Sequence, residues 1–99
     1  MNYLTKVDND TDLRDLKEEY RSFCKQNGLQ YLEAEFSNFH VFFASRNIAI
    51  EVKRGSDGYK ANVFDKEWDK HLASEYFDDR EEAEKEAVYQ GFKFLYRRD

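Results

Sequence analysis

The chain has 99 residues and a formal charge of −5, and 37% of its residues are charged while 17% are aromatic. This length is typical of one domain, and so high an aromatic content argues against a disordered chain. No run of about 18 apolar residues is present, and the first residues lack the apolar stretch of a signal peptide. An acidic chain neutralises phosphates poorly. We therefore expect no membrane association and no direct nucleic-acid binding, and a protein with a basic surface is the natural partner.

The cysteine and histidine content is low. Cys24 is the single cysteine, so an internal disulfide is excluded and a reducing, cytoplasmic compartment is expected. Two histidines and one cysteine make no zinc pattern, and no cofactor or metal is predicted. Cys24 falls on an apolar helical stripe, which favours a place in the core over a role as nucleophile.

The first predicted element is a helix that begins near Asp10. Residues 1–9 carry no periodic pattern, and we expect a tail or a short edge strand there. From Asp10 the apolar residues recur at three- and four-residue spacing, with Asn9 or Asp10 as the cap and Asn27-Gly28 as a strong stop. The apolar stripe of this helix consists of Leu13, Leu16, Tyr20, Phe23 and Cys24.

The period then changes to two, which predicts an antiparallel sheet of three or four strands. Candidate strands cover residues 29–36, 39–45, 48–53 and 59–63, with a short edge strand at 72–77. Residues 54–58 are rich in turn formers and predict a hairpin loop. Residues 65–71 are read as a loop or a single helical turn around Trp68.

A second helix is predicted from about Asp79 towards Arg97, with Asp78 and Glu81 in a capping-box arrangement. Gly91 would cost about 1 kcal/mol in a helix interior, so we expect a packing reason for it. The inner stripe would be Ala83, Ala87, Gly91, Phe94 and Leu95. The predicted fold is therefore a single α+β domain, helix–sheet–helix, with both helices on one sheet face.

The opposite sheet face would then be open. Nine phenylalanines, seven tyrosines and one tryptophan exceed what one small core readily holds. Two interpretations remain: an ordinary solvated face, or an interface with a partner or a second copy of the chain. The residues expected on this face are His40, Phe42, Ala44, Ala49, Glu51, Lys53, Lys60, Asn62 and Phe64.

An acidic stretch runs from Asp65 to Glu86, with ten acids, four bases and a net charge of −6. We expect its loop and helix start to lie together as one acidic pole. It is either a solvated helix start or a surface that imitates phosphate spacing and occupies a basic groove. The candidate partner-binding residues are Asp65, Glu67, Asp69, Glu75, Asp78, Asp79, Glu81 and Glu82, together with Phe42, Phe64 and Trp68.

Glu51-Val52-Lys53 has the Glu-x-Lys form of metal-dependent nucleases of the restriction-endonuclease type. In that chemistry two carboxylates hold a divalent metal and the lysine assists the water. The upstream aspartate is missing here, and Glu33 or Glu35 would have to replace it. An exposed strand also tends to show this alternation, so a nuclease that uses Glu51 and Lys53 is kept as an alternative function.

The segment Tyr76-Phe77-Asp78-Asp79-Arg80-Glu81-Glu82-Ala83-Glu84-Lys85-Glu86-Ala87 resembles a pattern in short proteins of phages and mobile elements. In those proteins a strand ending in Phe leads into a Glu-Glu-Ala helix. The resemblance covers about a quarter of the chain. It implies a small accessory protein in the host cytoplasm, such as an anti-CRISPR-like inhibitor of host defence.

The predicted order of helix, three strands and helix is also similar to that of double-stranded-RNA-binding domains. Ala83, Ala87 and Leu95 resemble the small-residue pattern of that family's last helix. That family's last helix begins with lysines that meet phosphates, whereas this one begins Asp78-Asp79-Arg80-Glu81-Glu82. The expected function is therefore a non-enzymatic protein-binding module. A nuclease and a structural homodimer are the alternatives.

Overall fold

The computed structural model describes residues 2–29 and 35–98. In chain order the elements are α1 (Thr5–Asp8), the 3₁₀ helix η1 (Thr11–Leu13), α2 (Arg14–Gln26), α3 (Phe36–Ala44), β1 (Ile48–Gly55), β2 (Gly58–Asp65), β3 (Lys70–Phe77) and α4 (Arg80–Arg98).

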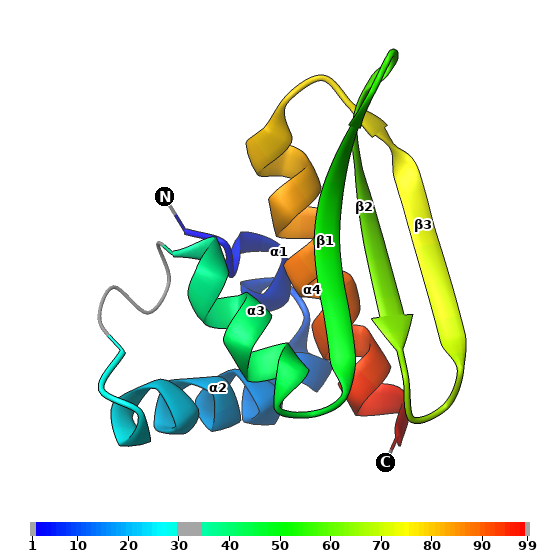
Figure 1. The fold of residues 1–99 in the computed structure, drawn as a ribbon. Coiled ribbons are helices and arrows are strands. Elements are labelled where there is room, and N and C mark those ends of the chain that lie inside the picture. Colours follow the sequence, from blue (N-terminus) through cyan, green and yellow to red (C-terminus); the bar gives the residue numbers. More distant parts are fainter. Residues whose placement is uncertain (1, 30–34, 99) are drawn as a thin grey trace.

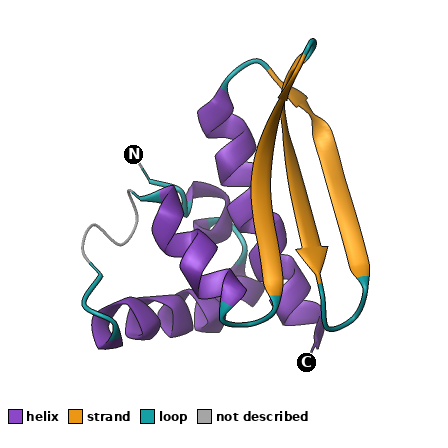
Figure 2. Ribbon diagram, in the orientation of Figure 1, coloured by secondary structure: helices purple, strands orange, loops and turns teal. Residues whose placement is uncertain are grey.

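The strands form one antiparallel sheet in the order β1-β2-β3, and the helices lie on one side of it (Figures 1 and 2). The long helix α4 contacts all three strands, and α3 contacts β1. Helix α2 packs on α3 and α4 rather than on the sheet. The predicted α+β class is confirmed, with α4 and α3 in direct contact with the sheet and α2 outside them.

The core is centred on aromatic rings. Phe92 of α4 lies edge-on to Tyr20 and to Phe43, with ring centroids 6.3 and 5.0 Å apart. Tyr20 stacks on Phe39 at 4.2 Å. All these side chains are fully buried. These aromatic residues belong to the core, so they are not evidence for a partner interface.

The structure shows why a glycine stands at position 91 inside α4, where the sequence predicts a packing reason for it. A Cβ atom at this position would lie 2.7 Å from the Phe43 ring, closer than side chains normally approach. The absence of a side chain lets α3 and α4 meet at this point. The close packing of Phe43 therefore offsets the low helix propensity of glycine at this position.

The first predicted helix is confirmed as η1 followed by α2. Asp10 accepts a hydrogen bond from the amide of Asp12 at 3.1 Å, which confirms it as a cap. Gly28 adopts a φ of +67°, the left-handed conformation expected after the last turn. Cys24 is fully buried on the inner stripe, and this burial raises the pKa of its thiol.

The predicted hairpin is confirmed and is tighter than expected. Gly55 pairs with Gly58, which leaves only Ser56 and Asp57 as the loop. Strand β3 lies at the sheet edge, as predicted, but it begins at Lys70, so the preceding turn covers residues 66–69 only.

The predicted strand at residues 39–45 is wrong, because this segment belongs to α3. Phe39, Phe42 and Phe43 are buried at helical spacing, while Val41 is 50% exposed. The aromatic residues have high β-propensity and alternate over a short run, which is the pattern of a strand. In the structure the segment is a helix that packs against α2, α4 and β1. Of the possible strand at 29–36, residues 30–34 lie outside the described part, and Phe36 begins α3.

Residues 1–9 were expected to be a tail or an edge strand, but residues 5–8 form α1. Tyr3, Leu4 and Val7 are buried in the core. One helical turn is too short to show a period in the sequence. The cap of α4 is also shifted by one residue, because Asp79, not Asp78, accepts the hydrogen bond from the amide of Glu81 at 3.0 Å.

Candidate functional site

The acidic residues predicted to form one pole lie in two groups at opposite ends of β3 (Figure 1). Asp65, Glu67 and Asp69 belong to the β2–β3 turn and its start. The second group follows at the other end of the strand, where β3 leads into α4. Strand β3 has eight residues and is about 26 Å long, and Glu75, near its far end, is the first acid of the second group. The prediction of a single pole is therefore wrong, because an extended strand runs through the acidic stretch.

Two of the three acids at the β2–β3 turn share one cation, Arg98. Asp65 is buried and bonded by Arg98, with 2.5 Å between Oδ1 and Nη2 and 3.1 Å between Oδ2 and Nε. Glu67 lies 3.3 Å from the same guanidinium. Asp65 therefore belongs to the interior of the fold rather than to a surface that a partner could reach.

The ionisation of Asp65 follows from this environment. Burial acts to raise the pKa of Asp65, but hydrogen bonds from Arg98 and from the backbone amides of Trp68 and Glu67 outweigh it. The pKa of Asp65 is held below its ordinary value as a result. The carboxylate stays charged and closes the turn.

The acidic end is defined here as Glu75, Asp78, Asp79, Glu81 and Glu82, at the junction of β3 and α4. Residues 75–84 hold six acids and one base, a formal charge of −5 that equals that of the whole chain. Within this set Glu82 pairs with Lys85 at 3.5 Å. Negative side chains at a helix start are favoured by the helix dipole, which accounts for their stability but not for their number.

Tyr3 anchors the acidic end to the N-terminal segment. Its hydroxyl donates a hydrogen bond to Oε1 of Glu84 at 3.2 Å, and Glu84 is itself 9% exposed. Burial and the Glu84 carboxylate raise the pKa of Tyr3 to about 12. The first turns of α4 are thus held rigidly against the rest of the molecule.

The three predicted aromatic partner residues do not form one surface. Phe42 is fully buried in α3, so its predicted place on the open face is wrong. Phe64 is half-buried on the open face of β2, with its ring 6.4 Å from that of His71. Trp68 is 50% exposed in the β2–β3 turn, far from the acidic end.

Glu51 and Lys53 lie on the open sheet face, as predicted, and pair with each other at 3.5 Å. The residue opposite Glu51 on β2 is Asn62, and the next in that row is Ala73 of β3. Neither is a carboxylate. Glu35 precedes α3 on the helix side of the sheet, and Glu33 lies outside the described residues. Across residues 2–29 and 35–98, no three His, Cys, Asp or Glu residues are grouped so as to hold a metal ion.

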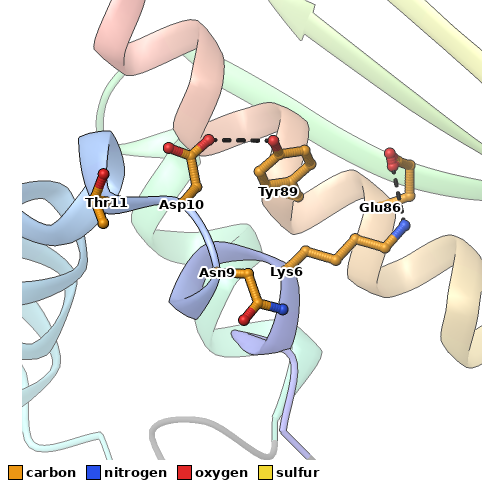
Figure 3. A pocket seen from close by; sticks show the side chains of 6 residues that line it. All are labelled: Lys6, Asn9, Asp10, Thr11, Glu86 and Tyr89. Carbon is orange, nitrogen blue, oxygen red and sulfur yellow. Dashed lines mark hydrogen bonds and ion pairs between the residues drawn. The ribbon is translucent and has the colours of Figure 1, made fainter.

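A polar cleft that sequence reasoning did not find lies between the N-terminal segment and α4 (Figure 3). Its volume is about 390 Å³, and it is lined by Lys6, Asn9, Asp10, Thr11, Glu86 and Tyr89. The hydroxyl of Tyr89 donates to Oδ2 of Asp10 at 3.2 Å, and Lys6 pairs with Glu86 at 3.2 Å. The sequence offers little to predict this cleft, because its residues come from a segment without periodicity and from the outer side of a helix.

None of the helices in the described part of the chain is long and apolar enough to cross a membrane. Comparisons of the chain with protein-family models, with curated proteins and with solved structures find no match in any of the three. The arrangement of charge at the acidic end and the cleft beside it are therefore the observations from which a function has to be argued.

Proposed function

We propose that this protein is a non-enzymatic binding module whose acidic end docks on a basic surface of a protein partner. The observation that carries the proposal is the concentration of a charge equal to the whole chain's −5 within residues 75–84. A charge localised in this way steers a partner of opposite sign and orients it on encounter.

The chemistry of the partner follows from the charge. Proteins that handle nucleic acids carry grooves of lysine and arginine that neutralise phosphates. Carboxylates on a rigid helix start are suited to occupy such a groove. We therefore favour a nucleic-acid-handling partner, with this protein acting as an inhibitor of the kind that phages and mobile elements encode.

The fold supports this proposal because it holds the acidic end in place. Asp79 caps α4, and Tyr3 bonds Glu84 one turn further on. The backbone of the acidic end then does not have to be ordered when a partner binds, which reduces the entropic cost of association.

The test is a charge reversal that spares these supporting contacts. Glu75, Asp78 and Glu81 are exposed, and the capping side chain at Asp79 is left intact. The triple variant Glu75→Lys, Asp78→Lys and Glu81→Lys should weaken binding to the purified partner by about tenfold or more, since charge pairs at an interface typically contribute 1–2 kcal/mol each. The partner itself is first identified by cross-linking and mass spectrometry in the native host.

A matched control has the same change in net charge elsewhere. Asp15→Lys, Glu18→Lys and Glu51→Lys lie on α2 and on the open sheet face, where the side chains are exposed. This control should bind within about twofold of the wild type at physiological salt, where distant charges are screened. Equal loss in both triple variants, or unchanged binding in the first, would contradict docking by the acidic end.

A further inference from the structure

The cleft continues the surface of the acidic end along α4. Glu82 and Glu86 are four residues apart, so they lie one turn from each other on the same side of the helix. Glu86 and Tyr89 of α4 line one side of the cleft, and the N-terminal segment that carries Asp10 lines the other (Figure 3). Glu82 of the acidic end and Glu86 of the cleft therefore belong to one continuous side of α4.

The lining of the cleft favours a cation. Two carboxylates, Asp10 and Glu86, face one ammonium group, Lys6, so the formal charge of the lining is −1. Asn9 and Thr11 add an amide and a hydroxyl. The volume of the cleft is near the lower end of the range for ordinary ligand sites, roughly 300–1,000 Å³, and the cleft is widely open to solvent. All six lining side chains carry a polar group, which suits a charged ligand better than an apolar one.

Hydrogen-bonding capacity remains on both carboxylates. Oδ1 of Asp10 accepts from the amide of Asp12, and Oδ2 accepts from Tyr89. Oε2 of Glu86 accepts from Lys6, and Oε1 accepts a longer bond from Gln90 at 3.4 Å. A carboxylate has about four acceptor positions, so each of these groups can accept further N–H donors.

The shape of the donor decides between arginine and lysine. A guanidinium is planar and offers five N–H donors in a fixed fork, and it can stack on an aromatic ring. The cleft presents separate acceptors on opposite walls with the Tyr89 ring between them (Figure 3). An ammonium group is compact and lacks this planar fork of donors.

We propose that the cleft bounded by Lys6, Asp10, Glu86 and Tyr89 is the receptor for an arginine side chain of the protein partner. This inference rests on the proposed function for the identity of the occupant, but its test does not need the partner. Asp10 and Glu86 accept from the guanidinium, and Lys6 limits the affinity because it competes for Glu86.

The test is an NMR titration of the ¹⁵N-labelled protein with N-acetyl-arginine amide and, separately, with the neutral analogue N-acetyl-citrulline amide. The arginine compound should produce saturable shifts in the amides of residues 9–11 and 86–89. The citrulline compound should produce none, because it has nearly the same shape and no charge. Equal shifts from both compounds, or shifts confined to other regions, would overturn the inference.

Two variants with opposite expected effects exclude loss of folding as an explanation. Glu86→Gln should weaken binding of the arginine compound by about two- to fivefold, whereas Lys6→Met should strengthen it by a similar factor, because partly exposed charge pairs are weak. A misfolded variant cannot bind more tightly. Weaker or unchanged binding by Lys6→Met, or unchanged binding by Glu86→Gln, would refute the assignment.

The two proposals fail in different ways. If the arginine compound leaves the cleft unaffected while the triple reversal at Glu75, Asp78 and Glu81 still abolishes partner binding, the docking surface stands and the arginine receptor is refuted. If the cleft binds the arginine compound but the triple reversal leaves partner binding unchanged, the receptor stands and docking by the acidic end is refuted.

Discussion

Arg98, near the end of α4, holds Asp65, the last residue of β2, through two hydrogen bonds of 2.5 and 3.1 Å. The same guanidinium donates to the backbone carbonyl of Arg46 at 2.6 Å. One side chain therefore joins the end of α4 to the β2–β3 turn and to the α3–β1 connection. This explains why an acid in the predicted docking surface has a structural role instead.

Removal of either partner of this pair should destabilise the fold. We expect Asp65→Ala or Arg98→Ala to lower the free energy of unfolding by about 2–3 kcal/mol, because each leaves a poorly solvated charge without its partner. Urea denaturation measures the effect. The double variant should cost less than the sum of the single ones, and strict additivity would show that the two side chains are not coupled.

The pKa of Asp65 makes the stability depend on pH. Its folded pKa is lowered below the ordinary value of about 3.9. The stabilisation is therefore complete above about pH 4 and is lost as the pH falls through the lowered folded pKa. In urea titrations between pH 2 and pH 6, Asp65→Asn should show a flatter acid limb than the wild type. Parallel limbs would contradict this assignment.

Gly91→Ala should destabilise the protein although alanine is the better helix former. The added Cβ would lie 2.7 Å from the Phe43 ring, and overpacking typically costs about 1–3 kcal/mol. Thermal or urea unfolding measures it. The second-site variant Phe43→Leu, which makes room for the methyl group, should recover part of the loss relative to Phe43→Leu alone. A stabilised Gly91→Ala protein would contradict the close contact of α3 and α4.

Helix α3 can be distinguished from the predicted strand by two substitutions. Val41 is 50% exposed and Phe42 is fully buried. Val41→Glu should change the free energy of unfolding by less than about 0.5 kcal/mol, whereas Phe42→Ala should cost about 3–5 kcal/mol. A strand that buries residues 39, 41 and 43 on one side would produce a large loss for Val41→Glu.

The N-terminal segment should contribute to stability although it was expected to be a tail or an edge strand. Tyr3→Phe removes the hydroxyl that bonds Glu84 and leaves that carboxylate buried with fewer donors. We expect a loss of about 1–2 kcal/mol in urea unfolding. The control Thr5→Ala, at an exposed position of α1, should cost less. A neutral Tyr3→Phe would show that the segment is not held by this bond.

Elements whose sequence signals are local could be predicted without the structure. The stripe and stop of α2, the alternation of β1 and β2, and the hairpin at Ser56-Asp57 are each encoded within a few neighbouring residues. Periodicity, turn residues and left-handed glycines act over that range, so these predictions needed no knowledge of distant contacts.

Features that join distant segments of the chain depend on the folded arrangement and could not be predicted in this way. The aromatic run of α3 is compatible with a strand or a helix, and its contacts with α2, α4 and β1 select the helix. The acidic stretch is continuous in sequence, but β3 places its halves at opposite ends, where Arg98 pairs with Asp65 and the start of α4 retains the negative charge. The number of charges in a stretch of sequence does not show where the side chains lie in space. The acidic end and the cleft beside it can therefore be located only in the fold.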